Sequence, residues 1–373
     1  MKDGSTGKAI LALEDGTVFE GTGFGARAEA AGEVVFQTSP TGYQEILTDP
    51  GSAGQLVVFA YPELGNVGVT DVAFESATVH AAGVVARHVA LAPSSHLAKE
   101  ALQPWLASHG TPGIEGIDTR MLIRHIRDGG PKRGVLSTLD GADAKTLVEK
   151  ARALPPATGL VARVSTKVRY ELPAEGASRF HVVVYDLGVK RSLLRRLAEQ
   201  GCRLTVVPFT TTAADVLALQ PDGIVLSGGP GDPSDLSEAE AAVRALLGKT
   251  PILGVNLGHQ LLAKAAGARM QRLVHPHHGA NYPVKELSTG KVAITGQSHS
   301  FAVDAESLGA IGAAVTHSSV HDGSVEGIEL PAFRAIGVQF HPESAPGPLD
   351  SLALFGRFTA MMEGAPVPDR SQA

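Results

Sequence analysis

Apolar and polar positions follow different patterns in the two halves of the chain. The first half has short runs that suit strands, at residues 9–13, 18–21, 33–38 and 55–60, and the turn at residues 14–17 predicts a hairpin. Two amphipathic helices are expected at residues 121–127 and 144–151, the first with Asp118 near its N-terminus. The pattern predicts a β-rich α/β domain over residues 1–155.

The second half alternates strands and helices. Apolar runs at residues 181–186, 203–208 and 223–226 are separated by helical patterns at 190–199 and 213–219, and another helix is expected at 236–247. This order predicts a doubly wound parallel sheet over residues 180–373. Residues 156–179 lack a clear period and contain Pro, Gly and Ser, so we expect an interdomain linker there.

Composition narrows the class of protein. With 43% apolar and 19% charged residues in 373, the chain is expected to be globular and large enough for two cores. A net charge of −6 gives no reason to expect a nucleic-acid partner, and the absence of a long apolar run argues against a membrane. A single cysteine, Cys202, fits a reducing cytoplasm and is expected to be a small core residue.

The segment Gly254–Gln260 has the pattern of a catalytic turn. It follows the apolar run 251–253 and precedes a helical run at 261–266, and two glycines flank the central residues. A strand, a sharp turn and a helix in this order lift the residue at the tip above the end of a sheet. The tip here is Asn256, whose carboxamide is not a useful nucleophile.

Two further loops are expected at the same edge of the sheet, because ligands bind at the carboxyl ends of parallel strands. Residues 227–233, after the strand at 223–226, contain Gly229 and Gly231, and their backbone N–H groups suit an oxyanion. The strand at 335–340 leads into His341 and Glu343, which suit a base and the carboxylate that orients it.

Other polar segments have ordinary explanations that the residues alone favour. Residues 297–301 suit a solvated turn, and residues 41–50 suit a helical turn closed by proline. The segment that contains His275, His277 and His278 suits a loop on the protein surface, so no metal site is expected there.

Together these segments resemble the class I, or triad, glutamine amidotransferases, and more narrowly the small subunit of carbamoyl phosphate synthetase. The general likeness is in residues 229–233, 258–260 and 341–343. The specific likeness is in the first half, in residues 42–50, 61–68 and 117–120. It covers nearly the whole chain, and it favours a family-specific role for residues 41–50 over a plain helical turn.

The resemblance implies a reaction and a set of partners. A thiolate at the turn would attack L-glutamine, His341 would serve as base and then acid, and Glu343 would orient it. Ammonia would pass to a large subunit that makes carbamoyl phosphate for arginine and pyrimidines, with ATP and Mg²⁺ bound there and no cofactor in this chain. The heterodimer, cytoplasmic in this family, can form higher oligomers. Glutamine-contact positions are Gly51, Gly229, Gly231, Leu257, Gln260, Ser298, Ser300 and Phe301.

Four of these positions depart from the family pattern. Asn256 stands at the nucleophile position, Ser298 and Ser300 stand where the family has Asn and Gly, and Gly51 stands where it has Ser. Two interpretations follow: a glutamine-hydrolysing subunit, or a pseudo-glutaminase that supports synthesis from free ammonia. A third, a serine hydrolase using Ser298 or Ser300, is disfavoured because neither lies in a strand–turn–helix segment.

Overall fold

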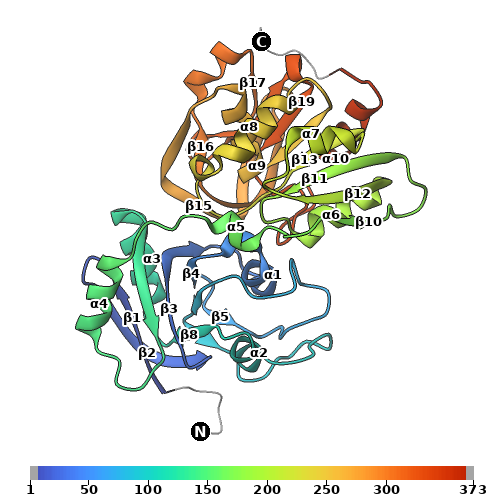
Figure 1. Ribbon diagram of the computed structural model, residues 1–373. Helices are drawn as coiled ribbons and strands as arrows, with labels where there is room; N and C mark the ends of the chain where they lie inside the picture. The colour runs from blue at the N-terminus through green and yellow to red at the C-terminus, as the bar shows by residue number, and fades with distance from the viewer. Residues whose placement is uncertain (1–6, 367–373) are drawn as a thin grey trace. The chain divides into compact units, whose positions relative to one another are not determined.

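The computed structural model describes residues 7–366 and divides the chain into two compact units, Met1–Ala157 and Thr158–Ala373 (Figure 1). The boundary lies close to the expected one. Within the described residues, no helix is long and apolar enough to cross a membrane.

The first unit is built around a closed barrel of seven strands, in the order β1-β2-β8-β6-β4-β3-β9. The sequence predicted β-rich structure here but not closure into a barrel. Apolar side chains from the barrel strands share a buried cluster, to which β1 contributes Ala9, Leu11 and Leu13 at every second position. The barrel strands are β1 (Gly7–Leu13), β2 (Val18–Gly25), β3 (Glu29–Gln37), β4 (Gln55–Phe59), β6 (Gly83–Val85), β8 (Pro112–Glu115) and β9 (Lys132–Ser137).

Four helices and a small two-stranded sheet complete this unit. Asp118 accepts a hydrogen bond from the Met121 N–H, which confirms the expected start of α3. Residues 43–48 form a helical turn, and Pro50 opens a 3₁₀ turn, η1 (Pro50–Ser52). The remaining elements are α1 (Tyr43–Thr48), α2 (Leu102–Ser108), α3 (Thr119–Gly129), α4 (Ala144–Ala153), β5 (Glu63–Leu64) and β7 (His88–Val89).

The second unit contains a ten-stranded sheet in the order β10-β12-β11-β13-β14-β19-β18-β17-β15-β16. Strands β12, β11, β13, β14 and β19 are parallel, as expected, and the others pair antiparallel. The strands are β10 (Tyr170–Leu172), β11 (Phe180–Asp186), β12 (Cys202–Pro208), β13 (Gly223–Leu226), β14 (Ile252–Val255), β15 (Met270–Glu286), β16 (Val292–Val303), β17 (Ala314–Ser319), β18 (Val325–Leu330) and β19 (Ala335–Val338).

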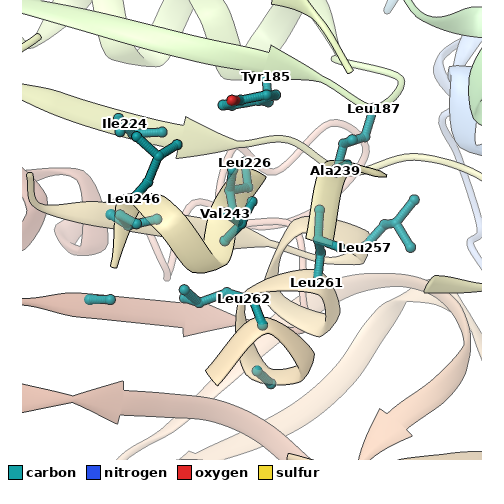
Figure 2. Close-up of a cluster of buried hydrophobic side chains, with 14 of the residues drawn as sticks. Tyr185, Leu187, Ile224, Leu226, Ala239, Val243, Leu246, Leu257, Leu261 and Leu262 are labelled. Carbon is teal, nitrogen blue, oxygen red and sulfur yellow. The ribbon is translucent and has the colours of Figure 1, made fainter. Parts of the chain in front are cut away.

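Helices cover both faces of this sheet, which makes it doubly wound. Along β11, Val183 and Tyr185 join one buried cluster, while Val182 and Val184 join the other. Helices α7, α8 and α9 contribute to the first cluster, and α6 and α10 to the second. Figure 2 shows the first cluster. The helices are α5 (Leu160–Val164), α6 (Arg191–Glu199), α7 (Ala213–Ala218), α8 (Ser237–Leu246), α9 (Leu257–Ala266) and α10 (Ala353–Met362).

The expected linker at residues 156–179 is wrong for most of its length. It contains α5, whose Val161 is buried in the second unit's core, and β10, which pairs antiparallel with β12 at the edge of the sheet. Elements of three to five residues are too short to show a periodic pattern of apolar positions, because a single buried side chain or three paired residues is enough to hold them in place.

Two polar segments are also more ordered than the sequence suggested. Residues 297–301, expected as a solvated turn, lie inside β16, and His275, His277 and His278, expected on a surface loop, lie inside β15. His275 is exposed, but His277 and His278 are buried. The cause is the pairing of β15 with β16, which sets His277 opposite His299 and His278 opposite Ser298.

Packing of α9 against the sheet should determine the stability of the second unit. Leu261 is fully buried, so Leu261→Ala should lower the free energy of unfolding by about 2–5 kcal/mol in urea denaturation. Leu349→Ala is the control: its side chain is largely exposed, and the change should cost no more than about 0.5 kcal/mol. Equal losses in the two variants would contradict this account of the core.

Candidate active site

The turn between β14 and α9 has the geometry that the sequence predicted. Asn256 lies at its tip with φ 51° and ψ −114°, a strained backbone conformation that L-residues rarely adopt. The flanking glycines are required by close approach. A Cβ on Gly258 would lie 2.1 Å from the Leu226 carbonyl oxygen, and one on Gly254 would lie 2.7 Å from the Gly258 carbonyl oxygen. The backbone therefore keeps a strained, tightly packed turn.

Asn256 is buried and makes two side-chain hydrogen bonds. Its Nδ2 donates to the Ser298 carbonyl oxygen at 3.1 Å and to His341 Nε2 at 3.1 Å. On the other side of the ring, His341 Nδ1 lies 2.7 Å from Glu343 Oε1. A carboxylate accepts, so Nδ1 carries the proton and Nε2 presents its lone pair to Asn256. This is the tautomer in which a histidine acts as a base toward the tip of the turn.

Lys190 completes this buried group of charges, although the sequence pattern predicted only that it starts a helix. Its Nζ lies 3.3 Å from Glu343 Oε1 and also donates to the Ala345 carbonyl oxygen. Burial disfavours the charged form of Glu343, but the electrostatic attraction and hydrogen bond of His341 and the charge of Lys190 favour it more strongly and lower the pKa of Glu343 to about 2; in the Nδ1–H tautomer, the contribution of His341 is its hydrogen bond. The position of Lys190 after the carboxyl end of β11 was the available signal.

Of the remaining predicted residues, all but Gly51 belong to the second unit. Gln260 Nε2 donates to the Phe301 carbonyl oxygen, 3.0 Å away, and Leu257 begins α9, where the first N–H groups have no partner within the helix. The loop with Gly229 and Gly231 also approaches: a Cβ on Gly228 would lie 3.1 Å from His341 Cε1. Ser300 lies on β16 with Ser298 and Phe301, whereas Gly51 belongs to the first unit, within η1.

Two other candidate nucleophiles do not suit the chemistry. Cys202 is fully buried at the beginning of β12, the opposite end from the carboxyl ends of the strands, and burial raises the pKa of its thiol to about 11. This confirms its interpretation as a core residue. Ser298 lies in a strand, with Oγ 3.4 Å from His278 Nδ1 rather than next to His341.

A doubly wound domain with a strand–turn–helix tip facing a His–Glu pair has the architecture of class I glutamine amidotransferases. The family model for glutamine amidotransferase class-I matches residues 183–361, and the model for the carbamoyl-phosphate synthase small chain, CPSase domain, matches residues 11–136. The chain belongs to the carbamoyl phosphate synthase small-chain family.

Relatives match along nearly the full length. The carbamoyl phosphate synthase small chain of Syntrophotalea carbinolica is 46% identical, covering 95% of this chain and 98% of the relative. The pyrimidine-specific small chain of Halalkalibacterium halodurans is 45% identical, covering 95% of this chain and 97% of the relative. Among solved structures, a glutamine amidotransferase from Thermotoga maritima is 19% identical over 49% of this chain and 93% of its own, with a TM-score of 0.36.

The buried Lys190–Glu343 contact should be a large contributor to the stability of the second unit. Lys190→Met leaves a buried carboxylate with one fewer partner, and we expect a loss of about 3–5 kcal/mol in the free energy of unfolding. Lys249→Met, at an exposed position, is the matched control and should change it by no more than about 0.5 kcal/mol. A loss in Lys190→Met no larger than in the control would refute the assignment.

The low pKa of Glu343 also predicts how stability depends on pH. Its folded pKa, about 2, lies below the ordinary 4.5, so the stability from its charge is complete above pH 4.5 and is lost as the pH falls toward 2. Glu343→Gln removes this contribution. Urea denaturation across this range should show a steeper acid loss in the wild type than in the variant, and parallel curves would disprove the assignment.

Proposed function

We propose that this chain is the small subunit of a carbamoyl phosphate synthase whose amidotransferase site keeps its base and orienting acid but lacks a nucleophile. One observation carries the proposal. Asn256 donates a hydrogen bond to His341 Nε2, the lone pair that would take the proton of an attacking thiol. An amide nitrogen in that position has a delocalised lone pair, so it forms no thioester-like intermediate.

The corresponding function of the subunit is structural. It forms a complex with the large subunit, where ATP, Mg²⁺ and bicarbonate are used, and the complex makes carbamoyl phosphate from free ammonia. His341, Gln260 and the backbone groups at this edge of the sheet remain available for hydrogen bonds, so a small amide or amino acid can still bind beside Asn256. Carbamoyl phosphate made in this way supplies arginine or pyrimidine synthesis in the cytoplasm.

A second candidate is a glutamine-hydrolysing subunit, and a separate observation favours it. His341, Glu343 and Lys190 form an intact, buried charge arrangement, with the base in its active tautomer. Loops with Gly229 and Leu257 at the same edge of the sheet suit an oxyanion. Such a site would hydrolyse glutamine if another group in the complex supplied the nucleophile.

One substitution, Asn256→Cys, distinguishes the two candidate functions. In the purified complex with its large subunit, the wild type should release ammonia from glutamine at least about 10³-fold more slowly than Asn256→Cys, because the missing thiol is the only triad member replaced. Synthesis from ammonium chloride should be equal in the two, which shows that the complex is intact.

A double variant separates restored chemistry from background. Asn256→Cys with His341→Asn should lose the gained activity, since the thiol then has no base. Hydrolysis by the wild type at an enzyme-like rate of about 1 s⁻¹ or more would overturn the proposal. If Asn256→Cys stays inactive while ammonia-dependent synthesis persists, the changes at Ser298 and Ser300 have also altered the site.

A further inference from the structure

A group of buried polar side chains lies on β16 and its neighbouring strands and takes no part in the reaction described above. It contains His277 on β15, His299 on β16 and Glu326 on β18, all of which are buried. One ligating atom from each lies within 4.8 Å of the others. Because His277 and His299 pair directly across the β15–β16 ladder, backbone hydrogen bonds hold both rings in place.

The hydrogen bonds on the far sides of the two rings determine where their lone pairs point. His277 Nε2 lies 2.9 Å from Asp322 Oδ2, and His299 Nδ1 lies 2.9 Å from the Phe301 carbonyl oxygen. Both oxygens can only accept, so these nitrogens carry the protons. In the neutral form of each ring, His277 Nδ1 and His299 Nε2 carry lone pairs on the side that faces Glu326. A histidine that donates one N–H to a carboxylate or a carbonyl is oriented as metal-binding histidines are.

Oxygen atoms of Glu326 and Gln297 face these two nitrogens. Glu326 Oε1 lies 3.5 Å from His277 Nδ1 and 3.9 Å from the Nε2 of His299. Within residues 7–366, neither Glu326 Oε1 nor His277 Nδ1 has a hydrogen-bond partner. Gln297 donates its Nε2 to Glu326 Oε2 at 2.7 Å, which leaves Gln297 Oε1 facing His299 Nε2 at 2.9 Å. One nitrogen or oxygen atom each from His277, His299 and Glu326 thus lies within 4.8 Å of the others at a buried position, an arrangement that costs free energy unless a proton or a metal ion bridges them.

We propose that His277, His299 and Glu326 bind one divalent transition-metal ion of the zinc type, with Gln297 Oε1 or a water as the fourth ligand. Two imidazoles and a carboxylate are a donor set that Zn²⁺ takes, whereas Mg²⁺ and Ca²⁺ prefer oxygen ligands alone. Tetrahedral bonds of about 2.1 Å set ligand atoms about 3.4 Å apart. The observed separations of 2.9, 3.5 and 3.9 Å lie around that value.

The proposed ion would have a structural role, because it would link three neighbouring strands of the second unit. It joins β15, β16 and β18 through side chains, next to Ser298, whose carbonyl oxygen accepts the Asn256 hydrogen bond. It would hold the strand that forms one wall of the active site. This role does not depend on glutamine hydrolysis, so the proposal stands apart from the proposed function.

Metal content of the untagged full chain tests the proposal. Chain purified without chelator should contain about one zinc per chain by mass spectrometry of the metal. After zinc removal, Co²⁺ should bind with a stoichiometry of one and give the visible absorption of a tetrahedral N/O site. A chain that contains no zinc and leaves the Co²⁺ spectrum unchanged would overturn the proposal.

Variants then assign the ligands. His277→Asn and Glu326→Gln should each abolish stoichiometric Co²⁺ binding, whereas His275→Asn, at the exposed histidine two residues away on the same strand, should bind as the wild type does. Asp322→Asn only removes the partner of His277 and should weaken binding about 10–100-fold. Because Asp322 is partly exposed, Asp322→Asn should fold. It therefore still tests the proposal if one of the ligand variants fails to fold. Undiminished binding in His277→Asn, Glu326→Gln and Asp322→Asn would refute the assignment.

Discussion

The hydrogen bond between Asn256 and His341 is the interaction on which the description of the active site depends. It joins the tip of the β14–α9 turn to His341, three residues after the end of β19, and β14 and β19 lie side by side in the sheet. His341 is held from behind by Glu343, and Glu343 in turn by Lys190. This chain of contacts fixes the tautomer of His341 and directs its lone pair at a side chain that has no labile proton to give.

The packing of the turn sets its backbone. Asn256 has φ 51° and ψ −114°, a strained conformation held between glycines that pack too closely for a side chain. The glycines on either side, the sheet beneath and the leucines of α9 are all compatible with the turn whatever its tip carries. The proposed loss of the nucleophile therefore concerns only the chemistry of the site and leaves the fold and family membership unchanged.

The sequence predicted the parallel sheet because its strands and helices alternate with a clear period. It predicted the turn at Asn256 and the His341–Glu343 pair because each follows a buried strand. Other features depend on tertiary pairing that no local pattern encodes. Barrel closure needs strands distant in sequence to meet, and the burial of His277 and His278 follows from the register of β15 with β16. Lys190 matches the local pattern of a helix start, and its partner Glu343 lies far away along the chain. A polar residue in a long hairpin resembles a loop residue until its cross-strand neighbour is known.

The source of the nitrogen in carbamoyl phosphate tests the central claim most directly. The wild-type complex would be supplied with glutamine labelled with ¹⁵N at its side-chain amide, together with unlabelled ammonium, ATP and bicarbonate. With Asn256 at the tip of the turn, the product should contain unlabelled nitrogen only. Incorporation of ¹⁵N into carbamoyl phosphate would show that the site hydrolyses glutamine without a cysteine at this position, and would contradict the account.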